Sequence, residues 1–388
     1  SPGVGDMPRA PSPLELAAFA IGTTEFIIAG LMPTIATDLS VSIPAAGLLV
    51  SGYAIGVAIG GPILALATAH VPRRPMILWM VGLYAIGHVF CAIAPNYAVL
   101  LAARVLVALT HGLFFGNTTI AAATVVPFER RGAAISVVLA GVPIANVLGV
   151  PFGAAIGHWL GWRASFWGVA ILAAIAFVAI ALTLPKIQED KAAAVPWRSQ
   201  IKVLFRHQIA LSYAALFVLM TGTLAFNTYQ VPFLINMTGV PEDSTPPFLF
   251  AYGAGAVAGI VLGGRLADWK LVPSTIGAAL AYAAVSAAIL LGMHSPIAMF
   301  VLMVVLGIAV WTFSVPPQTR IVHYSEGSGT VAATFTATAF NLGYTLGAVI
   351  GAILLTIGLG YPSLPVVGIA GGLLAAGITF WSWRLDRT

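Results

Sequence analysis

The sequence predicts an all-α integral membrane protein with twelve transmembrane helices, arranged as two pseudo-symmetric bundles of six. Three observations support this prediction. Hydrophobic residues make up 60% of the 388 residues and charged residues only 7%, whereas a soluble domain carries about 25% charged residues to face water. Apolar blocks of about 20 residues, the length that crosses a bilayer core of about 30 Å, recur along the whole chain. Basic residues gather at the two ends of the chain and in every second connection between these blocks.

Twelve apolar blocks, separated by polar segments, are each long enough to satisfy their backbone hydrogen bonds as a membrane helix. In chain order, the predicted spans lie near residues 14–37, 46–69, 76–94, 97–126, 132–158, 163–185, 207–236, 246–267, 273–292, 296–318, 328–358 and 362–383.

The positions of Lys and Arg predict the orientation, because connections rich in these residues stay in the cytoplasm. Fifteen of the 17 Lys and Arg residues lie at the two ends of the chain or in the even-numbered connections. The other two are Arg104, inside the fourth span, and Arg163, at the outer end of the sixth. We therefore expect both termini and the long connection 186–206 in the cytoplasm.

The 186–206 connection is the longest and most charged, and it divides the chain into two predicted bundles. The N-terminal bundle comprises residues 14–185 and the C-terminal bundle residues 207–383. Glycines at a helix end precede a basic turn at corresponding places in the two halves. Matching halves with a long central connection indicate alternating access about a site near the middle of the membrane.

The composition and motifs exclude other classes of protein. The net charge is +5, but no basic stripe with interleaved aromatic residues suggests a nucleic-acid partner. The single cysteine, Cys91, cannot form an intramolecular disulfide. We find no phosphate-binding loop, no zinc-type pair and no nucleophile elbow, so we expect no enzyme activity, cofactor or metal. Each chain supplies two halves and its own cavity, so a monomer is expected to be functional.

Two full charges lie deep in predicted spans, Glu25 in the first and Arg104 in the fourth. Ionisable residues inside a membrane are costly and indicate a functional site. Burial disfavours the charged form of a carboxyl, so Glu25 is predicted to bind and release a proton or to contact substrate. The alternative is a structural glutamate that a neighbouring helix neutralises, through Arg104 for example.

Arg104 must face a cavity or a partner, because arginine does not lose its proton. His111 and Phe115 follow on the same face at helical spacing. This stripe is predicted to face the central cavity, with His111 as a further proton-coupling candidate. The alternative is that Arg104 joins the fourth span to the first or fifth by hydrogen bonds.

Polar amides and aromatic residues on several spans are candidates for substrate binding, although interhelical hydrogen bonds and packing also explain such residues. The candidates besides Glu25 are Phe115, Asn117, Asn146, Asn227, Gln230, Phe340, Asn341 and Tyr344. Pro232 follows Asn227 and Gln230 and is expected to bend the seventh span there.

Glycine and proline in the fifth span, and the basic turns of both halves, are candidates for conformational change. The glycines allow close helix approach and the prolines allow bending, although dense packing without gating is an equal alternative. The predicted gating residues are Gly61, Arg73, Arg74, Gly141, Pro143, Gly149, Pro151, Gly153, Gly264 and Asp268.

Four motifs in these spans resemble the major facilitator superfamily. Gly264–Lys270 is similar to its short-loop signature, and Arg104 to its buried arginine. Gly141–Gly153 resembles the Gly-Pro motif of its exporting, proton-antiporting branches. Gly22–Pro33 is similar to the sugar-efflux and chloramphenicol-resistance group of drug:proton antiporters. The resemblance covers residues 14–383, but Ala69 stands where the first-half loop of the family often has an aspartate.

The resemblance implies a proton-coupled exporter of the bacterial inner membrane, with protons and a small organic molecule, such as chloramphenicol or a sugar, as its partners. An importer or facilitator of a sugar, nucleoside or organic acid on the same scaffold is the first alternative. A membrane receptor without transport is the second, and it predicts no need for Glu25 in mid-membrane.

Overall fold

The computed structural model describes residues 11–68, 71–127, 134, 137–138, 141–142, 144–185, 187, 206–325 and 329–386, and the regular structure in these ranges is entirely helical. The first half contains α1 (Pro11–Asp38), α2 (Ile43–Ala67), α3 (Arg73–Ala92), α4 (Tyr97–Thr124), the π-helical turn η2 (Ala145–Gly149), α6 (Val150–Leu160) and α7 (Trp162–Thr183). The second half contains α9 (His207–Asn227), α10 (Gln230–Phe233), the π-helical turn η4 (Leu234–Thr238), the 3₁₀ turn η5 (Glu242–Ser244), α11 (Pro246–Gly292), α12 (Pro296–Tyr324), α13 (Gly329–Thr356) and α14 (Ser363–Leu385).

Ten helices within the described ranges are long and apolar enough to cross a membrane. One of them contains α11, which covers both the predicted eighth and ninth spans. The backbone of α11 leaves the helical region at Lys270 (φ −151°, ψ 92°). Across that break, the Ser274 hydroxyl donates a hydrogen bond of 2.9 Å to the Leu266 carbonyl. The predicted fifth span corresponds to η2, α6 and the few described residues before them.

Local residue chemistry sets several helix ends. Ser42, Asn96 and Ser295 each accept a hydrogen bond from a backbone N–H in the first turn of α2, α4 and α12, which satisfies one of the free donors at a helix start. Gly161, between α6 and α7, has a φ of +86°. A residue with a Cβ adopts that conformation only with strain, so glycine permits the tight turn there.

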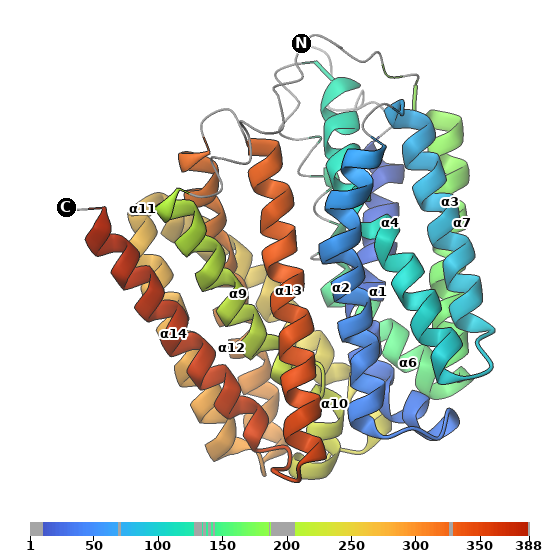
Figure 1. The fold of residues 1–388 in the computed structure, drawn as a ribbon. Helices are drawn as coiled ribbons and strands as arrows, with labels where there is room; N and C mark the ends of the chain where they lie inside the picture. The colour runs from blue at the N-terminus through green and yellow to red at the C-terminus, as the bar shows by residue number, and fades with distance from the viewer. Residues whose placement is uncertain are drawn as a thin grey trace, which may run out of the picture.

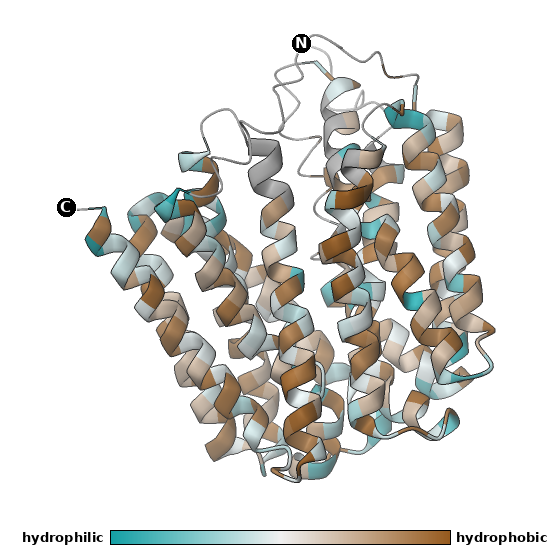
Figure 2. Ribbon diagram, viewed as in Figure 1, coloured by the Kyte–Doolittle hydropathy of each residue, from teal (hydrophilic) through white to brown (hydrophobic). Residues whose placement is uncertain are grey.

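Apolar side chains cover the outside of the molecule as well as its interior. Figure 2 shows hydrophobic residues along the length of the helices, with hydrophilic residues more frequent towards the helix ends. Leu182 and Leu291 are 81% and 89% exposed. A soluble protein rarely exposes such a continuous apolar surface, so this surface faces lipid.

The helices form two groups that meet along a long interface (Figure 1). Helices α1 to α7 pack on one another, and α9, α11, α12, α13 and α14 do the same, whereas α10 packs on α1 across the interface. Between the groups, α13 packs along α2, and α11 packs on η2 and α6. The Ser51 hydroxyl of α2 donates to the Thr345 carbonyl of α13 at 3.3 Å. A central site between the groups can therefore take side chains from both halves.

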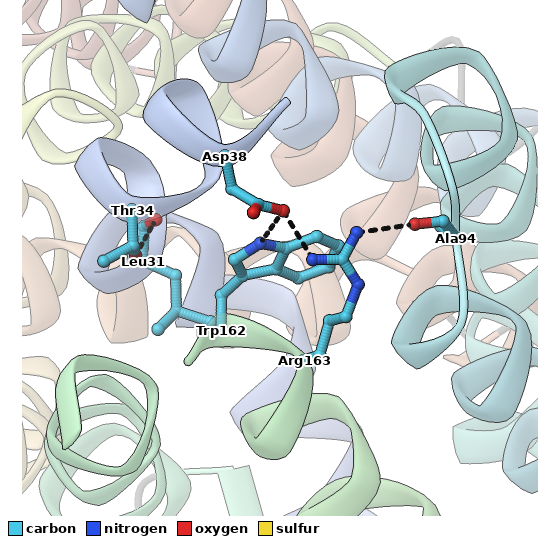
Figure 3. A network of polar contacts seen from close by, with 6 residues as sticks. All are labelled: Leu31, Thr34, Asp38, Ala94, Trp162 and Arg163. Carbon is cyan, nitrogen blue, oxygen red and sulfur yellow. Dashed lines mark hydrogen bonds and ion pairs between the residues drawn. The ribbon is translucent and has the colours of Figure 1, made fainter. Parts of the chain in front are cut away.

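At one end of the first group, three helices are tied together around Asp38, the last residue of α1 (Figure 3). Trp162 Nε1 donates to the Asp38 carboxylate at 3.0 Å, and Arg163 forms an ion pair with the same oxygen. Arg163 also donates to the Ala94 carbonyl after α3 at 2.9 Å. These contacts place the end of α1, the end of α3 and the start of α7 together, and we call this the Asp38 end.

The opposite end of the molecule is tied by other arginines. Arg74 Nε and Nη2 donate to the Leu184 and Ala181 carbonyls at 2.7 and 2.8 Å, so its cation lies at the C-terminus of α7, where a helix favours positive charge. In the second group, Arg320 of α12 forms an ion pair of 2.6 Å with Asp386 after α14. We call this the Arg74 end.

The predicted seventh span is broken where the sequence places a proline. The regular helix α9 ends at Asn227, Tyr229 has φ −107° and ψ 18°, and α10 then begins at Gln230. Pro232 has no N–H to donate to the carbonyl four residues earlier, which is consistent with a break at this point. Asn227, Thr228 and Gln230, beside this break, line a pocket that also takes residues from the first group.

Candidate functional site

Two adjoining pockets lie between the two groups of helices near the middle of the molecule. Their empty spaces are about 290 and 470 Å³, part of which opens to solvent. Both pockets are lined by Phe26, Asn146, Leu224, Asn227 and Tyr252. The first half contributes α1 and η2 to these shared walls, and the second half contributes α9 and α11. This arrangement is the one that a site of alternating access requires.

Glu25 lines the larger of the two pockets and is its one acidic residue. Among the described residues, no hydrogen bond or ion pair is formed to its carboxyl group, although Arg104 lies near enough to attract it electrostatically. No direct ion pair between Glu25 and Arg104 is therefore present among the described residues, and a structural role for Glu25 stays the alternative. An unpaired carboxyl at the wall of a central cavity is placed to exchange a proton or to bind a substrate.

Arg104 is fully buried and joins α4 to α1. Its Nη1 donates to the Thr24 carbonyl at 2.9 Å, next to Glu25 in the sequence. Its Nε and Nη2 are buried and make no hydrogen bond to any residue in the described ranges. The expected hydrogen bond from Arg104 to the first span is thus present, and Nε and Nη2 of the guanidinium are left without a protein acceptor in the described ranges.

Behind Arg104, His88 completes a buried polar network. Its Nδ1 lies 2.8 Å from the Tyr84 carbonyl and its Nε2 lies 2.8 Å from the Thr24 hydroxyl. A carbonyl only accepts, so in the neutral ring Nδ1 donates and Nε2 accepts from Thr24. Both ring nitrogens are occupied, and His88 holds the backbone of α1 beside Glu25 rather than facing a pocket.

The stripe of Arg104, His111 and Phe115 does not line either central pocket, in contrast to the sequence-based expectation. Instead, it packs against Tyr53 of α2. The guanidinium of Arg104 lies 4.3 Å from the centre of the Tyr53 ring, and His111 Nδ1 lies 2.8 Å from the Tyr53 hydroxyl. Phe115 stacks edge-on against His111. The three residues share a helix face, as predicted, but α2 covers that face. Proton coupling through His111 stays a prediction.

One buried acceptor lines the pockets from the second half. Asn227 Nδ2 donates to the Tyr252 hydroxyl at 2.9 Å, whereas Asn227 Oδ1 is buried and has no partner among the described residues. Trp311 Nε1 is also buried, and it lies beside the Tyr252 hydroxyl. An unsatisfied buried acceptor is unfavourable, so Asn227 Oδ1 is a candidate contact for a ligand. Gln230 also lines the larger pocket, but its amide is directed at Met303 Sδ, 3.2 Å away.

Aromatic rings form much of the wall of the smaller pocket. Phe26 and Tyr344 meet edge to face at 5.8 Å between ring centres, across the interface between the groups. Phe340 packs on Tyr344. Both predicted aromatic residues of the second half thus line the pocket, while Tyr252 was missed. It is a lone tyrosine in a long apolar run, and nothing in the sequence sets it apart.

Asn146 lines both pockets, as expected for a substrate-binding residue. Asn117 and Asn341, in contrast, are absent from both linings. Each donates back to a carbonyl four residues earlier in its own helix, at 3.0 Å. Asn341 also has a buried, unpaired Oδ1. A role for these two residues in substrate binding stays a prediction.

The glycines of the predicted fifth span pack against α1 rather than against the other half. A Cβ at Gly141, Gly149 or Gly153 would meet residues of α1, including Thr23 and Ile27. They therefore allow close packing inside the first group. Pro151 is buried in the first turn of α6, directly after the π-helical turn η2, and such turns are common sites of helix bending. Pro143 lies outside the described residues.

The structure gives packing or hydrogen-bonding contacts for only some of the predicted gating residues at the Arg74 end. Gly61 lets α2 approach the backbone of α4 at Gly112, and Arg74 binds the end of α7. Arg73 also interacts with other residues. Asp268 is exposed and Gly264 faces open space.

Ala69, where the resemblance is weakest, falls outside the described ranges. In those ranges, no three His, Cys, Asp or Glu side chains come close enough to hold a metal ion.

At the Asp38 end, the ring of Tyr229 lies in the interface between the groups. The Tyr229 hydroxyl donates to the Ala348 carbonyl of α13 at 2.9 Å. The same ring lies against Gly47 of α2 and Gly351 of α13, because a Cβ at either glycine would collide with it. Nearby, Val150 of α6 packs with Val231 and Leu249. The contact between Gly47 and Tyr229 could not be predicted from sequence, since the two residues lie in different halves of the chain.

Substitution of Arg104 by lysine tests whether the planar guanidinium matters. Lysine keeps the charge but loses the fork that reaches the Thr24 carbonyl and lies over Tyr53. A hydrogen bond to a charged group contributes about 1.5–3 kcal/mol, so we expect Arg104→Lys to lower the rate of the transport that the family resemblance implies about tenfold or more, as measured in liposomes. Arg163→Lys, at a partly exposed pair, is the matched control. An unchanged rate for Arg104→Lys would show that charge alone suffices.

The chain is similar to known transport proteins along nearly its whole length. A family model described as Major Facilitator Superfamily matches residues 14–348. Inner membrane transport protein YdhP of Escherichia coli K12 is 36% identical over 373 residues, which cover 96% of this chain and 95% of that protein. The Chloramphenicol resistance protein of Streptomyces lividans is 32% identical over 340 residues, covering 86% of each. The Probable sugar efflux transporter of Helicobacter pylori G27 is 28% identical, covering 95% of this chain and 92% of that protein.

Solved structures share the fold at lower sequence identity. A bacterial homologue of the human lysosomal transporter Spinster, inward-facing and occupied, matches with a TM-score of 0.72 at 18% identity, covering 98% of each chain. The nucleoside transporter NupG matches with a TM-score of 0.73 at 12% identity, covering 95% of this chain and 99% of that one.

Proposed function

The chain belongs to the major facilitator superfamily, and we propose that it exports a small organic molecule in exchange for protons, by alternating access. It is a multi-pass protein of the inner membrane, and it is a transporter rather than an enzyme, as its family and relatives show. Export, proton coupling and substrate class go beyond that family membership and are the content of the proposal.

The observation that carries the proposal is the unpaired carboxyl of Glu25 at the wall of a pocket between the two groups. A carboxyl at this position binds a proton when the pocket opens to the outside and releases it when the pocket opens to the cytoplasm. Protonation outside favours release of substrate, and loss of the proton inside prepares the site for the next molecule.

The proposed topology has twelve spans in two bundles, residues 14–185 and 207–383, joined by the cytoplasmic connection 186–206. The Arg74 end faces the cytoplasm, because Arg74, Arg206 and Arg320 lie there whereas Arg163 lies at the Asp38 end. The groups touch at the Asp38 end through Tyr229, which is consistent with a site closed to the outside.

The pocket favours a neutral, partly aromatic or hydroxylated substrate. Its walls combine aromatic rings with the unpaired Asn227 Oδ1, and Glu25 is the one ionisable group at the larger pocket other than tyrosine. Multiply charged molecules do not fit such walls, since they would be buried without counter-charges. Chloramphenicol and a sugar, named by two relatives, are suitable first candidates.

Flux measurements in liposomes test the proposal directly. Purified protein is reconstituted, a proton gradient is imposed, and accumulation of labelled chloramphenicol or sugar is followed with and without a protonophore. We expect a substrate to accumulate against its own gradient and the protonophore to abolish this accumulation. Transport that follows only the substrate gradient and ignores the protonophore would instead support a facilitator.

A further inference from the structure

A concave apolar surface lies on the outside of the first group, where α3 packs on α7. Its lining is Pro75, Leu78, Trp79, Gly82, Leu83 and Ile86 of α3, with Phe177 of α7. The groove has about 710 Å³ of empty space, including space open to the surroundings. Trp79 is 75% exposed. In a membrane, this groove faces the hydrocarbon chains of lipids.

Gly82 forms part of the floor of this groove. A Cβ at this position would lie 3.3 Å from Phe177 Cε2, and no other group lies as near. A larger residue at position 82 would therefore occupy the groove itself. The glycine leaves a space between the two helices that an acyl chain can enter.

Positive charge lies at one end of the groove. Arg74 directly precedes Pro75, and it binds the carbonyls of Ala181 and Leu184. Those carbonyls lie four and seven residues beyond Phe177 on α7, which corresponds to about 6 and 10 Å along the helix. The guanidinium is therefore one to two helical turns from the groove, on the side of the membrane surface at the Arg74 end.

Further features make this end suitable for an anion. Arg73 lies beside Arg74 as the first residue of α3, and the start of α3 has no side-chain cap. Uncapped N–H groups and the helix dipole favour negative charge there. Nη1 of Arg74 makes no hydrogen bond to any residue that the structure describes.

We propose that this groove binds an anionic phospholipid, with one acyl chain along α3 and α7 and the phosphate at Arg73 and Arg74. A phospholipid joins a long apolar chain to a negative charge at the membrane surface, which matches the order of groove and cations here. A second outer groove, between α11 and α12, is lined by Ala288, Leu291, Ser295, Ile297 and other uncharged residues. Neither groove has a basic residue in its lining, but Arg74 directly precedes Pro75 of the first groove, whereas no lysine or arginine is adjacent in sequence to any lining residue of the second. The second groove therefore lacks the feature that selects an anionic headgroup. Lipid binding at this groove requires that the chain lies in a membrane, but it does not depend on which substrate the protein transports.

Native mass spectrometry of the detergent-purified full chain tests the site. Phosphatidylglycerol and phosphatidylcholine with identical acyl chains are added in parallel, and the bound lipid is counted. We expect phosphatidylglycerol to bind at least fivefold better. Gly82→Leu should abolish this binding by filling the groove, while Ala288→Leu, which fills the other groove, leaves it unchanged. Arg73→Gln with Arg74→Gln should remove the preference between the two lipids.

Localisation and competition complete the test. Phosphatidylglycerol with a photoreactive acyl chain should label the peptide that contains residues 78–86 in the wild type. Because this experiment uses no variant, misfolding of a variant cannot affect its result. Equal binding of the two lipids, or equal loss in Gly82→Leu and Ala288→Leu, would overturn the proposal. Full displacement of the lipid by inorganic phosphate would also overturn it, by revealing a site for free phosphate.

Discussion

Glu25→Gln is expected to abolish proton exchange while substrate binding persists. In wild-type protein, addition of the substrate found in flux assays should release protons from the detergent-purified transporter. Glutamine has nearly the shape of a protonated glutamic acid but has no proton to lose. The unpaired position of Glu25 at the pocket wall means that no ion pair is broken by the change, so we expect the variant to remain folded.

The measurement is the pH change in weakly buffered solution on substrate addition, with binding followed separately by tryptophan fluorescence. Glu15→Gln is the matched control, since Glu15 lies on the same helix, ten residues before Glu25, and lines neither central pocket. We expect proton release from wild type and Glu15→Gln, and none from Glu25→Gln. If Glu25→Gln binds substrate and still releases protons, another group, such as His111, carries the coupling.

Gly47→Leu is expected to hold the Asp38 end open. In the structure, the Tyr229 ring occupies the space next to Gly47, so that even a Cβ there would collide with it. Overpacking of this kind costs about 1–3 kcal/mol, which corresponds to a shift of roughly 5- to 150-fold in the ratio of closed to open conformers. Since each transport cycle must close this end, the transport rate should fall by a similar factor.

Spin labels at Thr37 and Asp243, one on each group of helices near the Asp38 end, report this shift by their distance. We expect a longer distance in Gly47→Leu than in the parent. Gly168→Leu, where nothing lies within 4 Å of a new Cβ, is the matched control and should leave distance and transport unchanged. Removing the ring in the double variant Gly47→Leu, Tyr229→Ala should restore part of the activity. An unchanged label distance in Gly47→Leu would show that Tyr229 does not close the interface.

Much of this protein was predictable from sequence because the bilayer imposes a simple rule. Each apolar run long enough to cross the membrane becomes a helix, since no other local structure satisfies its backbone hydrogen bonds. The family assignment, the helical fold and the location in the inner membrane followed from this pattern and from motifs such as Gly264–Lys270. Glu25 also stood out, as a charge surrounded by apolar residues.

The composition of the central pockets was only partly predictable. Asn146, Asn227, Gln230, Phe340 and Tyr344 were candidates, and all of them line a pocket. Each is polar or aromatic within an apolar span, which is a signal the sequence carries. The same signal singled out Asn117 and Asn341, which hydrogen-bond within their own helices, so the residue type by itself does not decide the role.

By itself, the sequence determined which segments enter the membrane and which residues are unusual there. The reason is that the free energy of moving a segment from water into lipid is approximately the sum of the contributions of its own residues. Only the tertiary structure decided what those residues face. Arg104 and His111 share a helix face, but α2 covers it with Tyr53. Gly47 meets Tyr229 from the other half of the chain. The face that each helix turns towards its neighbours depends on how all the helices pack together. The sequence of a single segment therefore does not specify it.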